Sequence, residues 1–179
     1  MTATRVIETD RLVARPWRLE SDVEAVIALY SHLEVVRFIG NRLIETPEAA
    51  RAYLQFRIDR TRETGGIYGS WALIERESGQ VIGNILLKAL PGKNHVPTEH
   101  IEVGWHLARE AWGQGFATEA ARAMVHRAFH ELGLRRVVAV TEPDNTGSIA
   151  VMRRIGMTHV QQCSDFYDGE VLEVYELCM

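Results

Sequence analysis

The sequence predicts a mixed α/β (α+β) fold in which helices cover the faces of one sheet. Three observations predict it: two helical segments near the start, three consecutive strand-like segments in the middle, and a helix, strand, helix and final hairpin after them. Consecutive strands joined by short turns pair antiparallel, whereas a strand reached through a helix can pair in parallel, so the sheet is mixed. The length of 179 residues predicts a single domain over residues 1–179.

The first half of the chain contains one strand, two helices and three further strands. Pro16 ends the first strand, and Ser21 or Asp22 is a suitable cap for the first helix. Thr46-Pro47-Glu48 is typical of a helix start, with a cap, a proline and an acid in the first turn. The predicted elements are a strand over 10–15, helices to about 31 and over 47–63, and strands over 68–75, 81–87 and 100–107.

The second half contains the clearest helix, predicted from Ala117 to Leu132 by apolar residues on one face and ended by Gly133. An apolar strand over 136–140 and a short helix over 148–155 follow. Asp168-Gly169 predicts a type I′ turn in a hairpin over 160–177. In that hairpin Cys163 and Cys178 are not cross-strand partners, so no disulfide is expected.

Composition excludes several classes of function. The net charge of −4 and the pI of about 6.0 argue against nucleic acid or an anionic membrane as the main partner. The two cysteines form no CxxC pair and no zinc-ligand spacing, so no metal is expected. The first residues lack the apolar stretch of a signal peptide, and no apolar run approaches the length of a membrane span. We therefore expect a cytoplasmic protein.

The chemistry is concentrated in a glycine turn between a strand and a long helix, Trp112-Gly113-Gln114-Gly115-Phe116-Ala117. Glycines let the backbone turn tightly, and a helix start offers free N–H groups and partial positive charge, which together suit a pyrophosphate. Thr118 stands where a dinucleotide fingerprint needs its third glycine, and the Gly-Lys-Ser/Thr of a nucleotide-binding P-loop is absent. The turn alone fits a purely structural role equally well, and a nucleotide-binding module stays a weaker alternative.

The order of motifs along the chain resembles the GNAT acetyltransferase superfamily, and more narrowly the branch with the bacterial ribosomal-protein N-terminal (Rim-type) acetyltransferases. Each motif is modest alone, but together they span almost the whole chain. The matching segments are Thr9 to Trp17 (TDRLVARPW), Val81-Ile82-Gly83, Glu102-Val103-Gly104-Trp105, Trp112 to Ala120 (WGQGFATEA), and Asn145 to Ser148 before a helix ending in Gly156-Met157.

The resemblance implies a mostly antiparallel, seven-stranded sheet with about four helices and a splayed parallel pair formed by the strands at 100–107 and 136–140. It implies acetyl-CoA as co-substrate and no metal. Free backbone groups at the end of the first of these strands would hold the pantetheine arm, and one N–H would stabilise charge on the thioester oxygen. The implied cofactor-binding residues are Trp105, His106, Leu107, Gly113, Gln114, Gly115, Phe116, Ala117, Thr118 and Asn145.

Catalysis requires a base that takes a proton from the attacking amine. Glu102, on the strand beside the thioester site, is the first candidate, and His106 on the same face is the second. Ser148 is a candidate to hydrogen-bond the leaving thiol, although Ser148 and Asn145 both fit helix caps equally well. Many members of the family carry a tyrosine acid where this chain has Met152, so that role is excluded here.

These inferences predict acetyl transfer from acetyl-CoA to a primary amine by direct attack in a ternary complex. The acceptor is either a protein N-terminus or a small molecule such as a polyamine, an amino-sugar antibiotic or an amino acid. A homodimer is compatible with the sequence. The alternative from another class is an acyl-CoA-binding sensor with the same fold and little turnover, which only Met152 favours.

Overall fold

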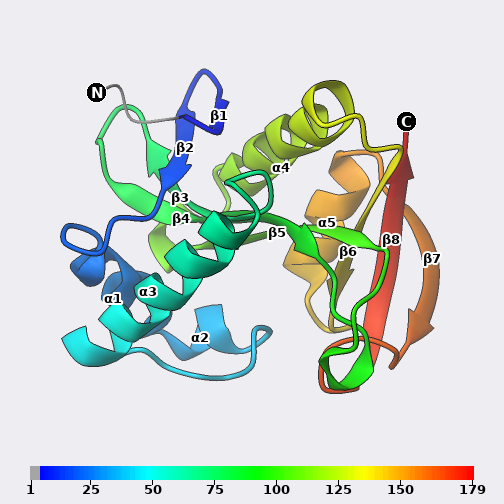
Figure 1. Ribbon diagram of the computed structural model, residues 1–179, viewed down its shortest axis with the longest axis horizontal. Helices are drawn as coiled ribbons and strands as arrows, with labels where there is room; N and C mark the ends of the chain where they lie inside the picture. The colour runs from blue at the N-terminus through cyan, green and yellow to red at the C-terminus, as the bar shows by residue number, and fades with distance from the viewer. Residues whose placement is uncertain (1–4) are drawn as a thin grey trace.

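A computed structural model describes residues 5–179. Its strands form one mixed sheet in the order β1-β2-β3-β4-β5-β6-β8-β7 (Figure 1), in which only β5 and β6 are parallel neighbours. This confirms the predicted class, with eight strands in the described residues because a two-residue strand pairs with β2 at the edge. The strands are β1 (Ile7–Glu8), β2 (Leu12–Pro16), β3 (Gly69–Glu75), β4 (Val81–Ala89), β5 (Ile101–Leu107), β6 (Arg136–Thr141), β7 (Thr158–Cys163) and β8 (Leu172–Cys178).

The predicted helices form close to their predicted bounds. In α3 the side chain of Thr46 accepts a hydrogen bond from the Ala49 N–H at 3.2 Å, and Pro47 occupies the first turn, as the start signal predicts. The four-residue α2 was not predicted. The helices are α1 (Val23–Tyr30), α2 (Leu33–Val36), α3 (Pro47–Glu63), α4 (Phe116–His126), extended by a π-helical turn at Arg127–Glu131, and α5 (Thr146–Arg154), with short 3₁₀ turns at Lys93–His95 and Arg109–Ala111.

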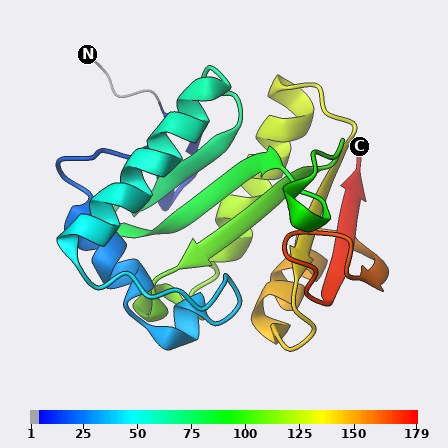
Figure 2. The same cartoon turned by 60° about the horizontal axis from the view of Figure 1, so that its bottom comes forward.

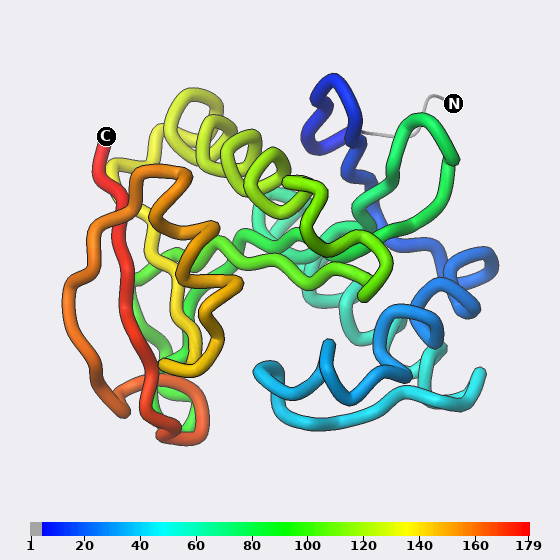
Figure 3. The backbone as a smooth tube through the Cα atoms, turned by 180° about the vertical axis from the view of Figure 1, so that it is seen from behind, coloured from blue at the N-terminus to red at the C-terminus, as the bar shows by residue number. Residues whose placement is uncertain are grey.

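Helices cover the two faces of the sheet differently. On one face α4 lies across the central strands (Figure 3). There it packs against alternate strand residues, among them Ile85, Val103 and Leu107, and buries Met124 completely. On the other face α1 and α3 cover β3 and the start of β4, with Leu54 fully buried there. Because side chains alternate along a strand, each central strand sends one set of residues to each face.

The parallel pair is splayed. β5 pairs with β4 over seven residues, from Ile101 to Leu107, but with β6 only at Glu102 opposite Val138. Beyond that point the two strands diverge, and Figure 2 shows the group of β6, β7, β8 and α5 set apart from the other half of the sheet. This confirms the splay that the family resemblance implied.

The last hairpin differs from its prediction. Cys163 pairs with Leu172, so eight residues, 164–171, connect β7 to β8, and the predicted two-residue turn at Asp168-Gly169 is wrong. The loop is longer because much of its backbone is hydrogen-bonded to the 91–94 segment, and its one internal backbone bond runs from the Gly169 N–H to the Phe166 oxygen at 3.0 Å. Cys163 and Cys178 are both free, as expected.

Among the helices of residues 5–179, none combines the length and the apolar character needed to cross a membrane.

Candidate active site

The glycine turn before α4 presents a row of free amides. Gly113 and Gly115 have φ of +76° and +82°, which a side chain adopts only with strain. The first amide hydrogen bond of the helix runs from the Glu119 N–H to the Gly115 oxygen at 3.0 Å. Within the described chain, no backbone acceptor is found for the N–H groups from Gly113 to Thr118, and these groups fit a pyrophosphate.

Arg11 fixes this turn to the start of the chain. Its side chain donates to the Gln114 carbonyl oxygen at 3.0 Å, forms an ion pair with Glu119 at 2.6 Å, and lies over the Phe116 ring. Thr9 also donates to Glu119, at 2.6 Å. Two of the motifs found in the sequence, at residues 9–17 and 112–120, therefore meet in space, which the sequence alone did not reveal.

Trp112 also contributes to the position of the turn. Its indole N–H donates to the Leu107 carbonyl oxygen at 2.9 Å, joining the turn to the end of β5. The interaction gives Trp112 a structural role between the turn and β5.

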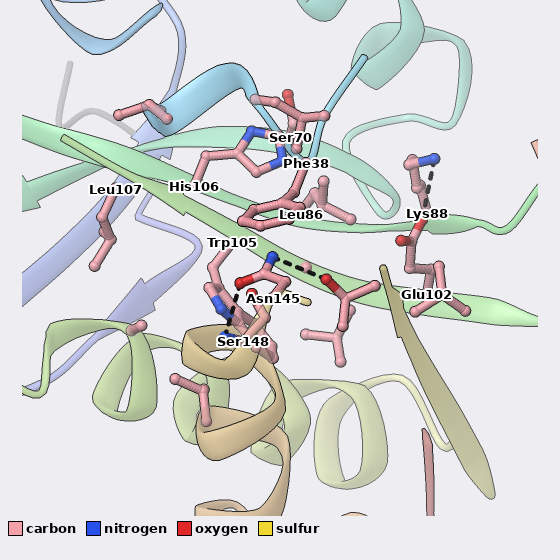
Figure 4. A pocket seen from close by; sticks show the side chains of 18 of the residues that line it. Phe38, Ser70, Leu86, Lys88, Glu102, Trp105, His106, Leu107, Asn145 and Ser148 are labelled. Carbon is pink, nitrogen blue, oxygen red and sulfur yellow. Dashed lines mark hydrogen bonds and ion pairs between the residues drawn. The ribbon is translucent and has the colours of Figure 1, made fainter. Parts of the chain in front are cut away.

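Three central strands form a polar floor beneath α1 and α3. The pairing of β3, β4 and β5 places eight residues on this face, aligned in rows that run across the strands. Along β5, Glu102 and His106 are both on this face, with Gly104 between them. Figure 4 shows His106 and Ser70 on one side of β5, and Trp105, Asn145 and Ser148 on the other. Each row lists cross-strand neighbours. Two rows run from β3 through β4 to β5, and the third joins β4 and β5 alone: Ala72, Asn84 and His106; Ser70, Leu86 and Gly104; Lys88 and Glu102.

Glu102 lies at the point where β5 leaves β6, and it is buried with two partners. The Lys88 ammonium lies 3.1 Å from Oε2, and the Tyr167 hydroxyl donates to the same oxygen at 2.5 Å. Lys88 also donates to the Tyr167 hydroxyl at 3.0 Å. Burial and the negative charge of Glu102 raise the pKa of Tyr167 far above its ordinary value, so this phenol stays protonated.

His106 belongs to a second hydrogen-bonded group. Its Nδ1 lies 3.0 Å from the Tyr30 hydroxyl, which in turn receives a hydrogen bond from Tyr53 at 2.8 Å. The tautomer of His106 decides the direction of this bond: when Nδ1 accepts from Tyr30, the imidazole proton is on Nε2. Burial lowers the pKa of His106 to about 3, and the positive charges of Arg57 and Lys88 act in the same direction. A neutral imidazole this weakly basic is a poor general base at neutral pH.

The remaining predicted site residues lie at the start of α5. The Asn145 side chain accepts from the Ser148 N–H at 3.2 Å and donates to Thr141 at 2.9 Å, so Asn145 is the helix cap. Ser148 stands in the first turn on the cavity wall, and Met152 is buried in the core behind it. The same cavity extends past Gly113 and Gly115 on this side and past Glu102 and His106 on the other.

Tyr167 reaches the site because two loops are joined. The Lys93 and Asn94 N–H groups donate to the Asp165 and Tyr167 oxygens at 2.6 and 2.9 Å, and the Tyr167 N–H donates to Pro91 at 3.2 Å. Asn94 and Tyr167 both have positive φ. Sequence analysis missed Tyr167, Tyr30 and Arg57. The only signal available was the polar pattern of the inward face of α3, where Tyr53 and Arg57 are one turn apart.

Solved acetyltransferase structures share this fold over nearly their whole length. One from Bacillus anthracis is 24% identical with a TM-score of 0.78, and each chain covers 98% of the other. RimL, a ribosomal L7/L12 N-terminal acetyltransferase in complex with coenzyme A, is 17% identical with a TM-score of 0.77 and 98% coverage of both chains. The fold is therefore that of the acetyltransferases.

The family follows from the sequence comparison. The model of the acetyltransferase (GNAT) domain matches residues 11–158, and the chain belongs to the GNAT acetyltransferase family. YoaA of Bacillus subtilis, an uncharacterised N-acetyltransferase, is 33% identical over 151 residues, which are 84% of this chain and 81% of YoaA. The protein is accordingly an acetyl-CoA-dependent N-acetyltransferase. In residues 5–179 no group of three or more potential ligands forms a metal site.

Proposed function

We propose that this enzyme transfers acetyl to a primary amine by direct attack, with acetyl-CoA and the acceptor bound together. The observation that carries the proposal is the cavity that joins the free amides of residues 113–118 to the buried carboxylate of Glu102. The free amides suit one end of an acyl-CoA, and the unpaired edge of β5 beyond Glu102 suits its arm. The whole chain, residues 1–179, is proposed to be one catalytic domain.

We assign the residues of the turn and of the end of β5 to the cofactor. Gly113, Gln114, Gly115, Phe116, Ala117 and Thr118 would bind the pyrophosphate through N–H groups. Trp105, His106 and Leu107 would bind the arm through backbone groups, one of which polarises the thioester carbonyl. Asn145 would contact the arm while capping α5, and Ser148 would hydrogen-bond the thiol as it leaves.

Glu102 is the proposed base, acting directly or through one water. It is buried at the floor of the cavity, at the last residue paired with β6, and it is bonded to Lys88 and Tyr167. The low pKa of His106 weighs against the second candidate. Met152 offers no proton, so the thiolate leaves without a tyrosine acid at that position.

A thiol-release assay over a panel of amines tests the proposal. We expect release that depends on both acetyl-CoA and an amine, with the acetylated amine found by mass spectrometry. Absence of acetyl-CoA binding by calorimetry at millimolar cofactor would overturn it. Tight binding of acetyl-CoA without transfer to any amine would support the sensor alternative, which the methionine at position 152 favours.

A further inference from the structure

The side of the cavity beneath α1 and α3, which we call the acceptor side, contains a guanidinium, that of Arg57, without a paired carboxylate. Arg57 is on the inward face of α3, one turn after Tyr53, and its guanidinium lies 4.9 Å from the centre of the Tyr53 ring. Within residues 5–179, no carboxylate lies within ion-pair distance of Arg57, and its buried Nε has no hydrogen-bond partner. Buried polar groups are nearly always paired, so this guanidinium calls for a partner.

Three carboxylates on the acceptor side of the cavity are already paired. Glu102 is paired with Lys88, Glu63 with Arg60, and Glu34 with Arg109. Burial opposes the charge of Arg57, yet the neighbouring Tyr53 and Tyr30 hold the pKa of its guanidinium above the ordinary value. The positive charge is therefore retained, and it disfavours a polycationic acceptor such as a polyamine or an amino-sugar antibiotic.

A second unpaired donor lines the same cavity. The hydroxyl of Ser70, on β3, is buried and has no partner in the described chain. A serine hydroxyl can rotate about its Cα–Cβ bond toward a ligand, and it donates as readily to a carboxylate as to a neutral oxygen. Three side chains in residues 5–179 hold a buried, unpaired polar atom, and two of them, Arg57 and Ser70, are among the residues that line this one cavity.

We propose that the acceptor is a small primary amine that carries a carboxylate, and that Arg57 with Ser70 binds this carboxylate while the amine faces Glu102. The inference rests on the proposed transfer reaction and names its substrate class. A planar guanidinium binds a carboxylate through two parallel hydrogen bonds, which suits a single carboxylate well. The unpaired positive charge of Arg57 also disfavours a second cation beside it, and so favours the uncharged form of the amine, which is the form that attacks.

The register of the sheet limits the shape of the acceptor. Ser70, Leu86 and Gly104 are neighbours across three strands, so Ser70 lies two strand spacings, about 10 Å, from the strand that borders the thioester site. A carboxylate at Ser70 and an amine at β5 are therefore separated by several bonds. This spacing favours ω-amino carboxylates over α-amino acids.

The proposal is tested by measuring kcat/KM for a series of ω-amino carboxylates, from glycine to 6-aminohexanoate. Each acid is compared with its uncharged primary amide. We expect kcat/KM to rise along the acid series, and the amide of the best acid to be roughly 10- to 100-fold poorer, as expected for loss of hydrogen bonds to a charged group. Equal kcat/KM for acid and amide would overturn the proposal. Preference for an aminoalkyl phosphonate over the matching carboxylate would overturn the choice of carboxylate.

Variants on α3 locate the binding group. Arg57→Gln should lower kcat/KM for the acid much more than for the amide and so remove the preference for acid over amide, and Arg57→Lys should keep part of that preference. Arg62→Gln, on the exposed side of the same helix, is the matched control and should keep the whole preference. If Arg57→Gln lowers kcat/KM for acid and amide equally, the role of Arg57 is structural and the proposal fails.

A measurement on the unmodified enzyme avoids any problem of folding. Hexanoate, which has the carboxylate and lacks the amine, should bind the enzyme–CoA complex in calorimetry and compete with the acceptor, and hexanamide should not. Failure of hexanoate to bind would contradict this inference alone. Absence of acetyl transfer to every amine, acid or amide, would instead contradict the proposed function, while the hexanoate measurement would still decide the carboxylate site.

Discussion

The two halves of the cavity are built in different ways. The proposed cofactor half consists mainly of backbone groups: the free amides of residues 113–118, which Arg11 and Trp112 fix in place, and the end of β5. The acceptor half consists of side chains from α1, α3, three strands and the 164–171 loop, such as Tyr30, Arg57 and Tyr167. The first half is sensitive to backbone conformation and the second to side-chain identity. The acceptor can therefore change by substitution without disturbing the cofactor site.

Glu102→Gln is expected to have the largest effect on turnover. The amide keeps the size of the carboxylate but cannot take a proton, so kcat should fall roughly 100-fold while the KM for acetyl-CoA changes little. Steady-state kinetics with both substrates varied measure this. A variant with the pH–rate profile of the parent enzyme would exclude Glu102 as the base. An equal effect on the KM for acetyl-CoA would break the separation of the two halves.

Gly115→Val tests the backbone half. A β-branched residue at a φ of +82° is strained, and its side chain obstructs the free amides, so the KM for acetyl-CoA should rise roughly tenfold or more while the protein stays folded. Gly79→Val is the matched control. Gly79, in the β3–β4 turn, also has a positive φ, of +69°, but it is not among the residues that line the cavity. The control should lose stability alone. An unchanged KM in Gly115→Val would refute the assigned phosphate site.

Tyr167→Phe tests whether the hydrogen bond from Tyr167, on the 164–171 loop, affects the activity of Glu102 as the proposed base. Removing the hydroxyl leaves the ion pair with Lys88 and deletes the 2.5 Å hydrogen bond to the carboxylate. We expect kcat to change by a few-fold, less than in Glu102→Gln, because the carboxylate loses one hydrogen bond and keeps its other partner. A change confined to thermal stability would show that Tyr167 only holds the loop.

His106→Asn should have the smallest effect at neutral pH. The amide oxygen replaces Nδ1 as the acceptor for Tyr30, so kcat should change less than in the other variants. The native His106 has a pKa of about 3 against 6.5 when exposed, so the unfolded chain binds more protons between these values and stability falls as the pH drops through that window. Because part of the ring borders the open cavity, the loss is roughly 1–3 kcal/mol.

Denaturant unfolding at several pH values measures this effect. The parent enzyme should lose stability from pH 6.5 downward more steeply than His106→Asn does. Parallel curves for the two proteins would show that His106 is protonated as readily in the folded state as in the unfolded chain.

The difference between the backbone half and the side-chain half of the cavity also explains which features could be predicted from the sequence. The turn at 113–117 was recognised because its glycines, its helix and its flanking strand are contiguous, and the splay followed from the family resemblance. Tyr30 and Arg57 were missed because their role depends on where α1 and α3 pack over the sheet. The type I′ turn at Asp168-Gly169 was wrong because local turn preference was overridden by hydrogen bonds to residues about 70 positions earlier.

The joined loops at 91–94 and 165–167 have a mechanical consequence for the sheet. One loop precedes β5 and the other precedes β8, so their hydrogen bonds join the two halves of the sheet at the end where β5 and β6 still pair. The halves thus form a wedge with its apex at Glu102 and its open side toward α4 and α5. We expect a wedge joined at its apex in this way to bind its cofactor with little hinge movement, so that little binding free energy is lost to rearrangement.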